Sequence, residues 1–309
     1  MESPLPHSRL DKPEKKPRKA KRVLILANPT ATSFRFQRIT EIVKCLEEAG
    51  MKVELKLTNR ASEITETCTD PDLNTDILAI AGGDASVSEA ASAMLGRGMK
   101  PHLAIIPFGT ANVLAHELGV PSAPKEIAKA IIAGKTQKLH NGYANGRPFF
   151  LSTSTGFDAE VVHVVPLRLK RRYGRFASLF IAAQLAFSRR KGSFKVRADG
   201  EELQCAMALI INGRYYAGKH LVVPEASILE KQLHLLTFKE DGAWALFKYA
   251  CRLLTGSVVK SRNVECRTIK TARIEAYRAA AVQIDGEPFG GTPLEVSVGD
   301  CELTVICGN

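Results

Sequence analysis

The segment AIAGGDAS at residues 79–86 decides the fold of this chain, and IPFGTAN at residues 106–112 repeats its pattern. In each segment a short apolar run stops at glycine and small polar residues, and a run with helical apolar spacing follows. This pattern indicates a buried parallel strand that leads through a loop into a helix. Glycine lets backbone N–H groups approach an anion, and Ser or Thr adds a hydroxyl donor. We therefore expect two phosphate-binding loops, unless the glycines only shape tight turns.

The residues around these loops predict that strands and helices alternate. Strands are expected at residues 23–27, 53–57, 76–81 and 102–106, and helices at residues 36–46, 61–68, 87–94 and 111–118. Such alternation is typical of a mostly parallel sheet with helices on both faces. Ligands of these sheets bind at the carboxyl ends of the strands. The loops at Asn28, Thr58, Gly82–Ser86 and Gly109–Asn112 would meet at that edge.

Beyond residue 135 the pattern changes to short strands separated by turns such as Asp199-Gly200 and Asp285-Gly286. This pattern predicts an antiparallel sheet or sandwich, which helical stretches at residues 173–188 and 243–254 interrupt. We therefore expect an α/β fold with two domains. An N-terminal, mostly parallel α/β domain at residues 22–135 is followed by a C-terminal antiparallel β-rich sandwich domain at residues 136–294.

The net charge of +11 is unevenly distributed along the chain. Residues 1–22 contain eight basic and three acidic residues, which accounts for +5 of that excess. Because residues 1–21 are rich in Pro and Lys and poor in apolar residues, they predict a disordered tail. The tail either keeps the protein in solution, which we favour, or is attracted to an anionic membrane surface. We expect no nucleic-acid partner.

The composition also excludes several classes of protein. No apolar run reaches the roughly 18 to 20 residues that cross a bilayer, and the first residues lack the apolar centre of a secretory signal. The seven cysteines contain no CxxC pair, and the seven histidines show no HExxH spacing. Neither a disulfide framework nor a zinc site is expected. We therefore expect a cytoplasmic protein, and we leave open contact with the inner face of the membrane and a homodimer.

The two loops match neither common nucleotide-binding pattern. GxGxxG is absent from both loops and GxxxxGK[ST] is absent from the chain, which argues against ordinary Rossmann and P-loop folds. Instead, GGDAS at residues 82–86 resembles the GGDGT loop of the diacylglycerol kinase catalytic-domain family, which is related to the NAD kinases and sphingosine kinases. Further segments match that family in the same order: PFGTAN at 107–112, ELGVP at 117–121, GFDA at 156–159, INGR at 211–214, PEA at 224–226 and QIDGEP at 283–288. The resemblance covers residues 22–300 and is closest to the bacterial soluble lipid kinases.

This resemblance implies an N-terminal domain of NAD kinase/diacylglycerol kinase type, with ATP bound in the cleft between the domains. It also implies that residues 295–309 return to the first domain. The implied nucleotide contacts are Asn28, Thr58, Gly82, Gly83, Asp84, Ala85, Ser86, Gly109, Thr110 and Asn112. Asp84 is expected to act through Mg²⁺, because a divalent ion needs a hard carboxylate ligand. Taken alone, Asn28 and Thr58 would more often be turn residues at strand ends.

The resemblance identifies Asp285 as the general base. Phosphoryl transfer to a hydroxyl needs a carboxylate near the attacking oxygen, both to orient it and to accept its proton. The dipeptide Asp285-Gly286 alone would predict only a hairpin turn. The flanking Gln283, Glu287 and Pro288 match the catalytic segment of the family and favour the catalytic interpretation.

Three positions depart from the family pattern. Glu230 aligns with an aspartate beside which some members hold a second Mg²⁺, but here Lys231 places a cation next to it. Ala85 stands where the family has glycine. If that glycine has a positive φ, alanine costs on the order of 1 kcal/mol, and its methyl group would crowd a phosphate. Ser88 stands where asparagine is common.

The sequence says less about the acceptor. Basic residues flank the apolar stretch at residues 176–187, and a second stretch presents Trp244 and Phe247. Such helices lie at a lipid surface or form domain core. We predict an ATP- and Mg²⁺-dependent lipid kinase whose substrate is the hydroxyl of a diacylglycerol-like or sphingoid-like lipid. One alternative is a catalytically weak nucleotide- or lipid-binding regulator, because of Ala85, Ser88 and Lys231. The other is an NAD kinase-like enzyme with a soluble acceptor, against which the GFDA segment argues.

Overall fold

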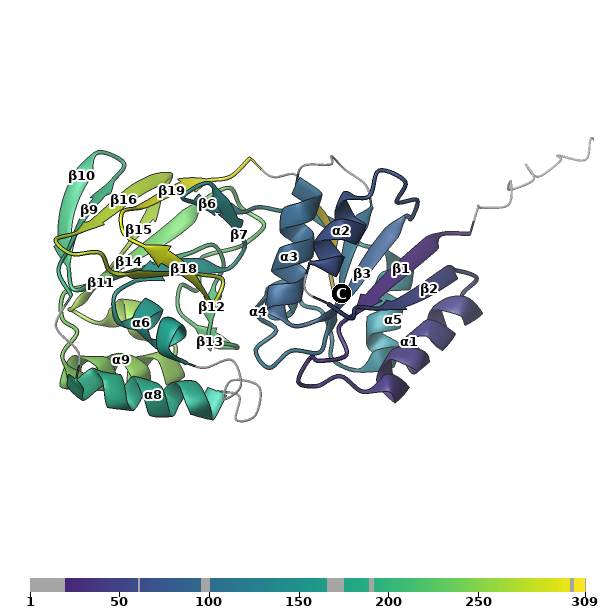
Figure 1. The fold of residues 1–309 in the computed structure, drawn as a ribbon, viewed down its shortest axis with the longest axis horizontal. Helices are drawn as coiled ribbons and strands as arrows, with labels where there is room; N and C mark the ends of the chain where they lie inside the picture. Colours follow the sequence, from purple (N-terminus) through teal and green to yellow (C-terminus); the bar gives the residue numbers. More distant parts are fainter. Residues whose placement is uncertain are drawn as a thin grey trace, which may run out of the picture.

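The computed structural model describes residues 20–60, 62–95, 101–165, 175–188, 192–300 and 303–308. The chain forms two lobes that lie side by side (Figure 1). The expected basic tail, apart from residues 20 and 21, lies outside the described residues. Within the described part, no helix combines the length and apolar character that crossing a bilayer requires.

The first lobe is built on a six-stranded sheet with the order β2-β1-β3-β4-β20-β5. Its first four strands are β1 (Arg22–Ala27), β2 (Lys52–Leu57), β3 (Ile77–Gly82) and β4 (His102–Pro107), and all of them pair in parallel. The helices are α1 (Phe36–Glu48), α2 (Glu63–Thr69), α3 (Asp84–Leu95), α4 (Val113–Glu117) and α5 (Pro124–Ala133). Of these helices, α5 was not predicted from the sequence.

Strand β1 is buried on both faces, which explains its continuous apolar sequence. Val23 and Ile25 point into a core shared with α1 and α5, whereas Leu24 and Leu26 point into a core shared with α2 and α3. Successive residues of a strand face opposite sides, so one short segment supports both helical layers. The carboxyl ends of β1, β3 and β4 therefore meet at one edge, above which α3 and α4 begin.

The last strand of the chain lies inside the first sheet. Strand β20 (Leu303–Ile306) pairs in parallel with β4 and antiparallel with β5 (Thr136–Leu139). Strand β5 follows the expected domain boundary at residue 135, yet it belongs to this sheet because β20 supplies its partner. The chain passes to the second lobe after β5 and returns to the first lobe before β20.

The second lobe is an antiparallel sandwich. One sheet has the order β10-β9-β16-β19-β6-β7 and the other has the order β15-β14-β11-β8-β17-β18. The strands of the first sheet are β6 (Gly142–Ala144), β7 (Arg147–Phe149), β9 (Phe194–Ala198), β10 (Glu201–Cys205), β16 (Thr271–Ala276) and β19 (Leu294–Val298). Those of the second are β8 (Ser152–Thr155), β11 (Met207–Ile211), β14 (Leu233–Phe238), β15 (Val264–Ile269), β17 (Ala281–Ile284) and β18 (Glu287–Gly291). Strands β12 (Tyr215–Tyr216) and β13 (His220–Leu221) form a separate small ribbon.

Helices cover the outer face of the second sandwich sheet. They are α6 (Phe157–Val164), α8 (Arg175–Ser188) and α9 (Ala243–Leu254), and the short helix η1 (Val258–Lys260) follows α9. The residues of β11 alternate between the two sides: Ile210 packs between the sheets, and Leu209 and Ile211 pack under α9. The predicted fold class is confirmed. The predicted strand at residues 149–153 is wrong, because β7 ends at Phe149 and β8 begins at Ser152.

Candidate active site

The two predicted phosphate loops touch each other. Gly82 and Pro107 pair at the ends of β3 and β4, and Phe108 N–H donates to Gly82 O at 2.9 Å. A methyl group on Gly109 would lie 2.5 Å from Gly83 Cα and 2.7 Å from Asn112 Oδ1. Glycine is therefore required here by the close approach of two backbones rather than by an unusual φ.

Asn112 braces the second loop from within. Its backbone is left-handed, with a φ of 50°, and its side chain closes on the peptide of Gly109. Gly109 N–H donates to Asn112 Oδ1 at 2.8 Å, and Asn112 Nδ2 donates to Gly109 O at 2.8 Å. Thr110 is exposed beside this brace, and its hydroxyl donates to Thr32 Oγ1 at 3.2 Å. Asn112 thus shapes the loop, and Thr110 offers its hydroxyl at the surface.

Three further predicted residues lie at the same sheet edge. Asn28 follows β1, and its Nδ2 donates to Ser86 Oγ at 3.4 Å, which links the first strand end to the first loop. Its Oδ1 accepts from Thr30 N–H at 2.9 Å. Thr58 follows β2 but is buried, and its hydroxyl donates to Ala27 O at 3.4 Å. The structure therefore shows Thr58 closing a strand end, whereas Asn28 and Ser86 belong to the loop cluster.

Ala85 does not have the backbone strain that a positive φ at this position would cause. Helix α3 begins at Asp84, so Ala85 lies in its first turn, and it is not among the described residues with a positive φ. Its side chain is exposed. The condition for the expected cost, a positive φ at this position, is therefore not met, because Ala85 already belongs to α3.

Replacing Ala85 with glycine should therefore raise neither the stability nor the activity of the protein. We expect Ala85→Gly to lower the free energy of unfolding by about 0.5 kcal/mol, because glycine loses more backbone entropy in a helix. The turnover of ATP should stay within a factor of about two. Thermal unfolding and steady-state kinetics would measure both. A rise in kcat of tenfold or more would show instead that the methyl group crowds a bound phosphate.

Asp84 lies at the junction of the two loops and α4. Its Oδ1 accepts a hydrogen bond from Leu114 N–H at 3.1 Å, at the N-terminal end of α4. Burial raises the pKa of the Asp84 carboxyl above its ordinary value, and the backbone N–H groups of residues 112–114 oppose that rise. The charge of Asp285 raises it further. Two carboxylates from different lobes are therefore close enough to influence each other.

Asp285 occupies the turn between β17 and β18, with a left-handed φ of 49°. Its carboxylate accepts three backbone N–H groups from the chain between β7 and β8: Phe150 at 3.0 Å, Leu151 at 2.8 Å and Ser152 at 3.0 Å. Burial raises the pKa of the Asp285 carboxyl, and these hydrogen bonds oppose the rise. The side chain is thus locked in one orientation by donors that favour its ionised form.

A fourth donor to Asp285 comes from the other lobe. Ser88, one turn into α3, donates its hydroxyl to Asp285 Oδ2 at 2.9 Å. Sequence reasoning listed Ser88 only as a departure from the family pattern. The contact could not be found from spacing, because 197 residues separate the two partners.

Removing this donor should shift the pH profile of the enzyme. The Ser88 hydrogen bond lowers the pKa of Asp285, so Ser88→Ala should raise that pKa and move the acid limb of kcat to higher pH. We expect kcat at neutral pH to fall about fivefold, the effect of one ordinary hydrogen bond. Ser92→Ala, one turn further along α3, is the matched control. An unchanged acid limb in Ser88→Ala would contradict the assignment of that limb to Asp285.

A buried polar cluster supports the Asp285 turn from behind. Gln283 Oε1 accepts from Gly286 N–H at 2.8 Å, and its Nε2 donates to Asp158 Oδ2 at 3.3 Å. Asp158, from the GFDA segment, also accepts the hydroxyl groups of Ser154 and Tyr216. Burial raises the pKa of Asp158, and burial together with this carboxylate raises the pKa of Tyr216. The GFDA segment therefore contributes a support rather than a group that faces the loops.

Glu117 joins the two lobes beside α4. Its side chain is almost fully buried and accepts Tyr215 N–H at 2.7 Å, with Arg214 Nε 3.8 Å away. A methyl group on Gly213 would lie 2.3 Å from Glu117 Oε1. Two landmark segments of the sequence, ELGVP and INGR, thus form one contact between the lobes.

Glu230 stands apart from the site. It is exposed and accepts from Gln232 Nε2 at 2.6 Å, and the neighbouring Lys231 forms an ion pair with Asp300. Across the described residues there is no cluster of three or more His, Cys, Asp or Glu side chains able to hold a metal.

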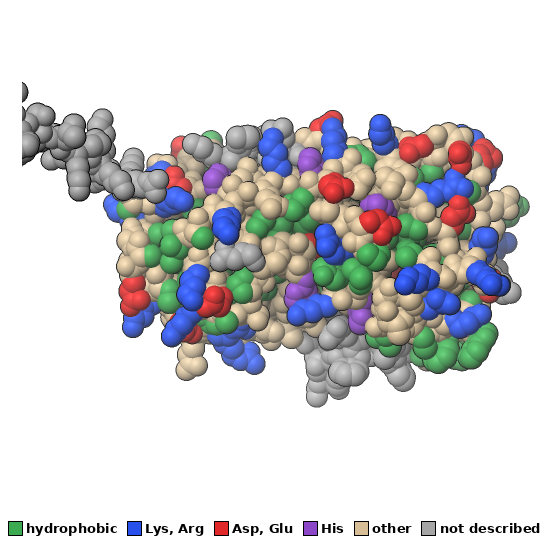
Figure 2. Space-filling view, turned by 180° about the vertical axis from the view of Figure 1, so that it is seen from behind, with side chains coloured by type: hydrophobic (Ala, Val, Ile, Leu, Met, Phe, Trp, Pro, Cys, Tyr) green, Lys and Arg blue, Asp and Glu red, His purple; other side chains and the backbone are tan. Residues whose placement is uncertain are grey.

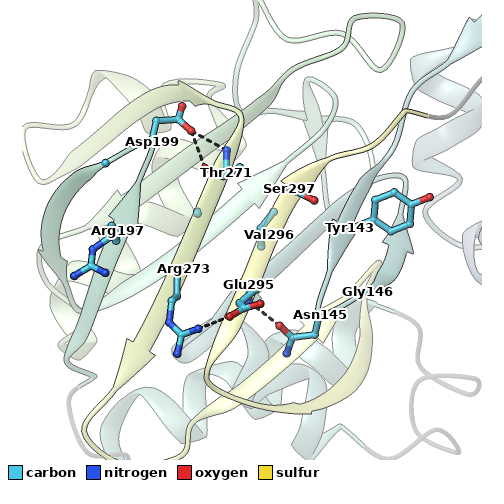
Figure 3. A pocket seen from close by; sticks show the side chains of 12 residues that line it. Tyr143, Asn145, Gly146, Arg197, Asp199, Thr271, Arg273, Glu295, Val296 and Ser297 are labelled. Carbon is cyan, nitrogen blue, oxygen red and sulfur yellow. Dashed lines mark hydrogen bonds and ion pairs between the residues drawn. The ribbon is translucent and has the colours of Figure 1, made fainter.

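A shallow hollow lies on the outer face of the first sandwich sheet (Figure 3). Its side chains come from β6, β9, β16 and β19, so the sandwich core separates it from the sheet that carries Asp285. The charged groups in it are paired: Arg273 with Glu275 and Glu295, and Arg197 with Glu202. None of the predicted site residues lines this hollow.

Comparisons with known proteins agree with this two-lobed architecture. The family model of the diacylglycerol kinase catalytic domain matches residues 22–144, and the model of the YegS C-terminal NAD kinase beta sandwich-like domain matches residues 151–307. The chain belongs to the diacylglycerol kinase catalytic-domain family.

Named relatives cover nearly the whole chain. The diacylglycerol kinase of Bacillus subtilis is 24% identical over 282 residues, which are 89% of this chain and 92% of the relative. That of Staphylococcus aureus strain MRSA252 is 25% identical over 277 residues, 88% of each chain. A crystal structure of a diacylglycerol kinase from Bacillus anthracis superposes with a TM-score of 0.77 at 24% identity, covering 94% of this chain and 98% of that one. This last likeness shows the fold.

Proposed function

We propose that the protein is an ATP-dependent lipid kinase that transfers the γ-phosphate to a hydroxyl of a diacylglycerol-like or sphingoid-like lipid. One observation carries the proposal: Asp285 of the second lobe hydrogen-bonds to Ser88, four residues after Asp84 on α3. A locked carboxylate thus stands at the edge where two glycine loops meet. Membership of a kinase family supports ATP as the phosphate donor.

In the proposed reaction, Asp285 accepts a hydrogen bond from the lipid hydroxyl and then its proton as the oxygen attacks phosphorus. Its three backbone donors favour the ionised form of the carboxylate and fix its orientation. The loops at Gly82–Ser86 and Gly109–Thr110 surround the phosphates, since their glycines leave room for backbone N–H groups to approach an anion.

Mg²⁺ fits the residues present. The ion is typically held by one or two carboxylates together with substrate phosphates, not by a cage of protein ligands, and Asp84 offers such a carboxylate beside Asp285. Bound there, it would neutralise charge on the phosphates. Glu230 is left out of this proposal because its carboxylate pairs with Gln232 and its neighbour Lys231 pairs with Asp300.

Of the three residues that suggested a catalytically weak regulator, Ala85, Ser88 and Lys231, the first two no longer support that alternative. Ala85 sits in an unstrained helical turn, and Ser88 supplies a donor to Asp285. Lipid acceptors reside in membranes, so the proposal includes contact with an anionic membrane surface.

The test is to incubate the pure chain with γ-labelled ATP, Mg²⁺ and dispersed lipids, with diacylglycerol and a sphingoid base in separate reactions. Label should enter one lipid fraction. Label in neither fraction, or transfer to NAD in a parallel reaction, would contradict the proposed activity.

A further inference from the structure

Helix α9 is apolar on both of its sides. Ala245, Leu246 and Tyr249 are buried against the second sandwich sheet. On the opposite side, Trp244 is 69% exposed, Phe247 57% and Leu254 72%. Large apolar side chains that gather on an exposed surface mark contacts with other proteins or with membranes, so the outward side of α9 indicates such a contact.

The neighbouring helix extends this surface. Helix α8 packs beside α9, and its Phe187 is 85% exposed. On α9, the rings of Trp244 and Phe247 stack with centroids 5.4 Å apart. Figure 2 shows hydrophobic side chains gathered at the lower right, the end of the molecule that carries α8 and α9, with Lys and Arg side chains beside them. We call Phe187, Trp244, Phe247 and Leu254 the α9 face.

The charged residues of α9 and of the segment after it are all basic, whereas Glu240 and Asp241 lie just before the helix. Residues 242–264 contain four basic residues and no acidic residue: Lys248, Arg252, Lys260 and Arg262. Lys248 is exposed one position after Phe247, on the same side of the helix. Basic side chains can place their stems along apolar surface and their charged ends in a headgroup layer. An anionic lipid surface complements both the charge and the apolar side chains.

We propose that the α9 face is the surface by which the protein docks on an anionic bilayer. Trp244 and Phe247 enter the interfacial layer, where aromatic side chains are favoured, and Lys248 contacts lipid phosphates. Helix α6 connects this surface to the candidate site. It contacts α8, and it also contacts β17 and β18, the strands that flank Asp285. The inference rests on the proposed function for the presence of a lipid acceptor, but docking itself needs no ATP.

The sequence provides its own probe, because Trp244 is the only tryptophan in the chain. The full chain would be titrated, without ATP, with vesicles of phosphatidylcholine alone and with vesicles that also contain phosphatidylglycerol. We expect the emission of Trp244 to shift to shorter wavelength only with the anionic vesicles, and the protein to sediment with them. No spectral shift and no sedimentation would overturn the proposal even if the chain phosphorylates lipid in detergent.

Variants locate the surface. Phe247→Ser should weaken binding to anionic vesicles at least about tenfold, since it removes one buried aromatic ring, and Lys248→Glu about fivefold or more. Tyr277→Ser removes a still more exposed ring, 96% accessible, after β16 on the other sandwich sheet, and should bind as the wild type does. All three should keep activity on a detergent-dispersed acceptor. If Phe247→Ser instead converts a dimer to a monomer without weakening vesicle binding, the α9 face is a contact between copies and the proposal fails.

Discussion

Asp285→Asn is expected to lower kcat for lipid phosphorylation by about 10² to 10⁴-fold, the usual contribution of a general base. The single oxygen of asparagine can accept from Leu151 and Ser152, as Asp285 Oδ1 does, but its amide nitrogen cannot accept from Phe150 N–H. Asparagine also cannot take a proton from the attacking hydroxyl. The affinity for ATP should change little, because Asp285 contacts the lipid hydroxyl and not the phosphates in the proposed reaction. Initial rates with labelled ATP, together with ATP titration calorimetry, would separate the two effects.

The chain contains a matched control for this substitution. Asp199 also precedes a glycine in a turn with a left-handed φ, 45°, and accepts the backbone N–H groups of Lys270 and Thr271. It lies in the hollow on the outer sheet, away from the loops. Asp199→Asn should therefore lose a comparable amount of stability and keep its activity. Undiminished labelling in Asp285→Asn would remove the proposed mechanism.

The pKa of Asp285 also predicts the direction of the pH dependence. Since burial raises this pKa and the ionised form is the active base, activity should fall on acidification above the pH at which an ordinary aspartate is protonated. Asp285→Asn should lose this acid limb from its residual activity.

Gly109→Ala should have the second largest effect. The added methyl group would meet Gly83 Cα at 2.5 Å and Asn112 Oδ1 at 2.7 Å, so the two loops must separate or the Asn112 brace must break. Displacing phosphate-binding groups by about 1 Å can cost 100-fold in rate, and we expect a loss of that order in kcat/KM for ATP. The crowding should also lower the free energy of unfolding by about 1–3 kcal/mol.

Gly242→Ala is the control for that substitution. Gly242 has an ordinary φ of −67° and no atom within 4 Å of an added methyl group. It should keep the wild-type kcat/KM for ATP, and as the N-cap of α9 it should lose no more than about 1 kcal/mol of stability. If Gly109→Ala binds ATP normally while its stability falls, the contact between the loops serves packing alone.

The sequence alone predicted the parts of this molecule that depend on local pattern. The strand ends at Asn28 and Gly82 and the β-rich second half follow from apolar spacing and turn residues, which act over a few positions. That these strand ends meet at one edge of the sheet follows from the general geometry of parallel sheets. The close approach of Gly83 and Gly109 to each other was not predicted, because the sequence suggested only that their N–H groups approach an anion.

What escaped prediction depends on pairs that are distant in the chain. The hydrogen bond from Ser88 to Asp285 and the contact of Glu117 with Tyr215 arise only when the two lobes come together. Ala85 shows the opposite case: a rule about glycine was applied to a position whose φ is set by where α3 begins. The spacing of residues in one sequence does not show which distant residues will pair, nor at which residue a helix will begin.

The position of β20 has a consequence for the order in which the chain can fold during synthesis. The sheet of the first lobe lacks the strand between β4 and β5 until residues 303–306 have left the ribosome. The sandwich, whose strands all precede β20, can form while the first lobe is still incomplete. The two glycine loops of the first lobe would therefore be among the last features to reach their final form, although their residues are made early.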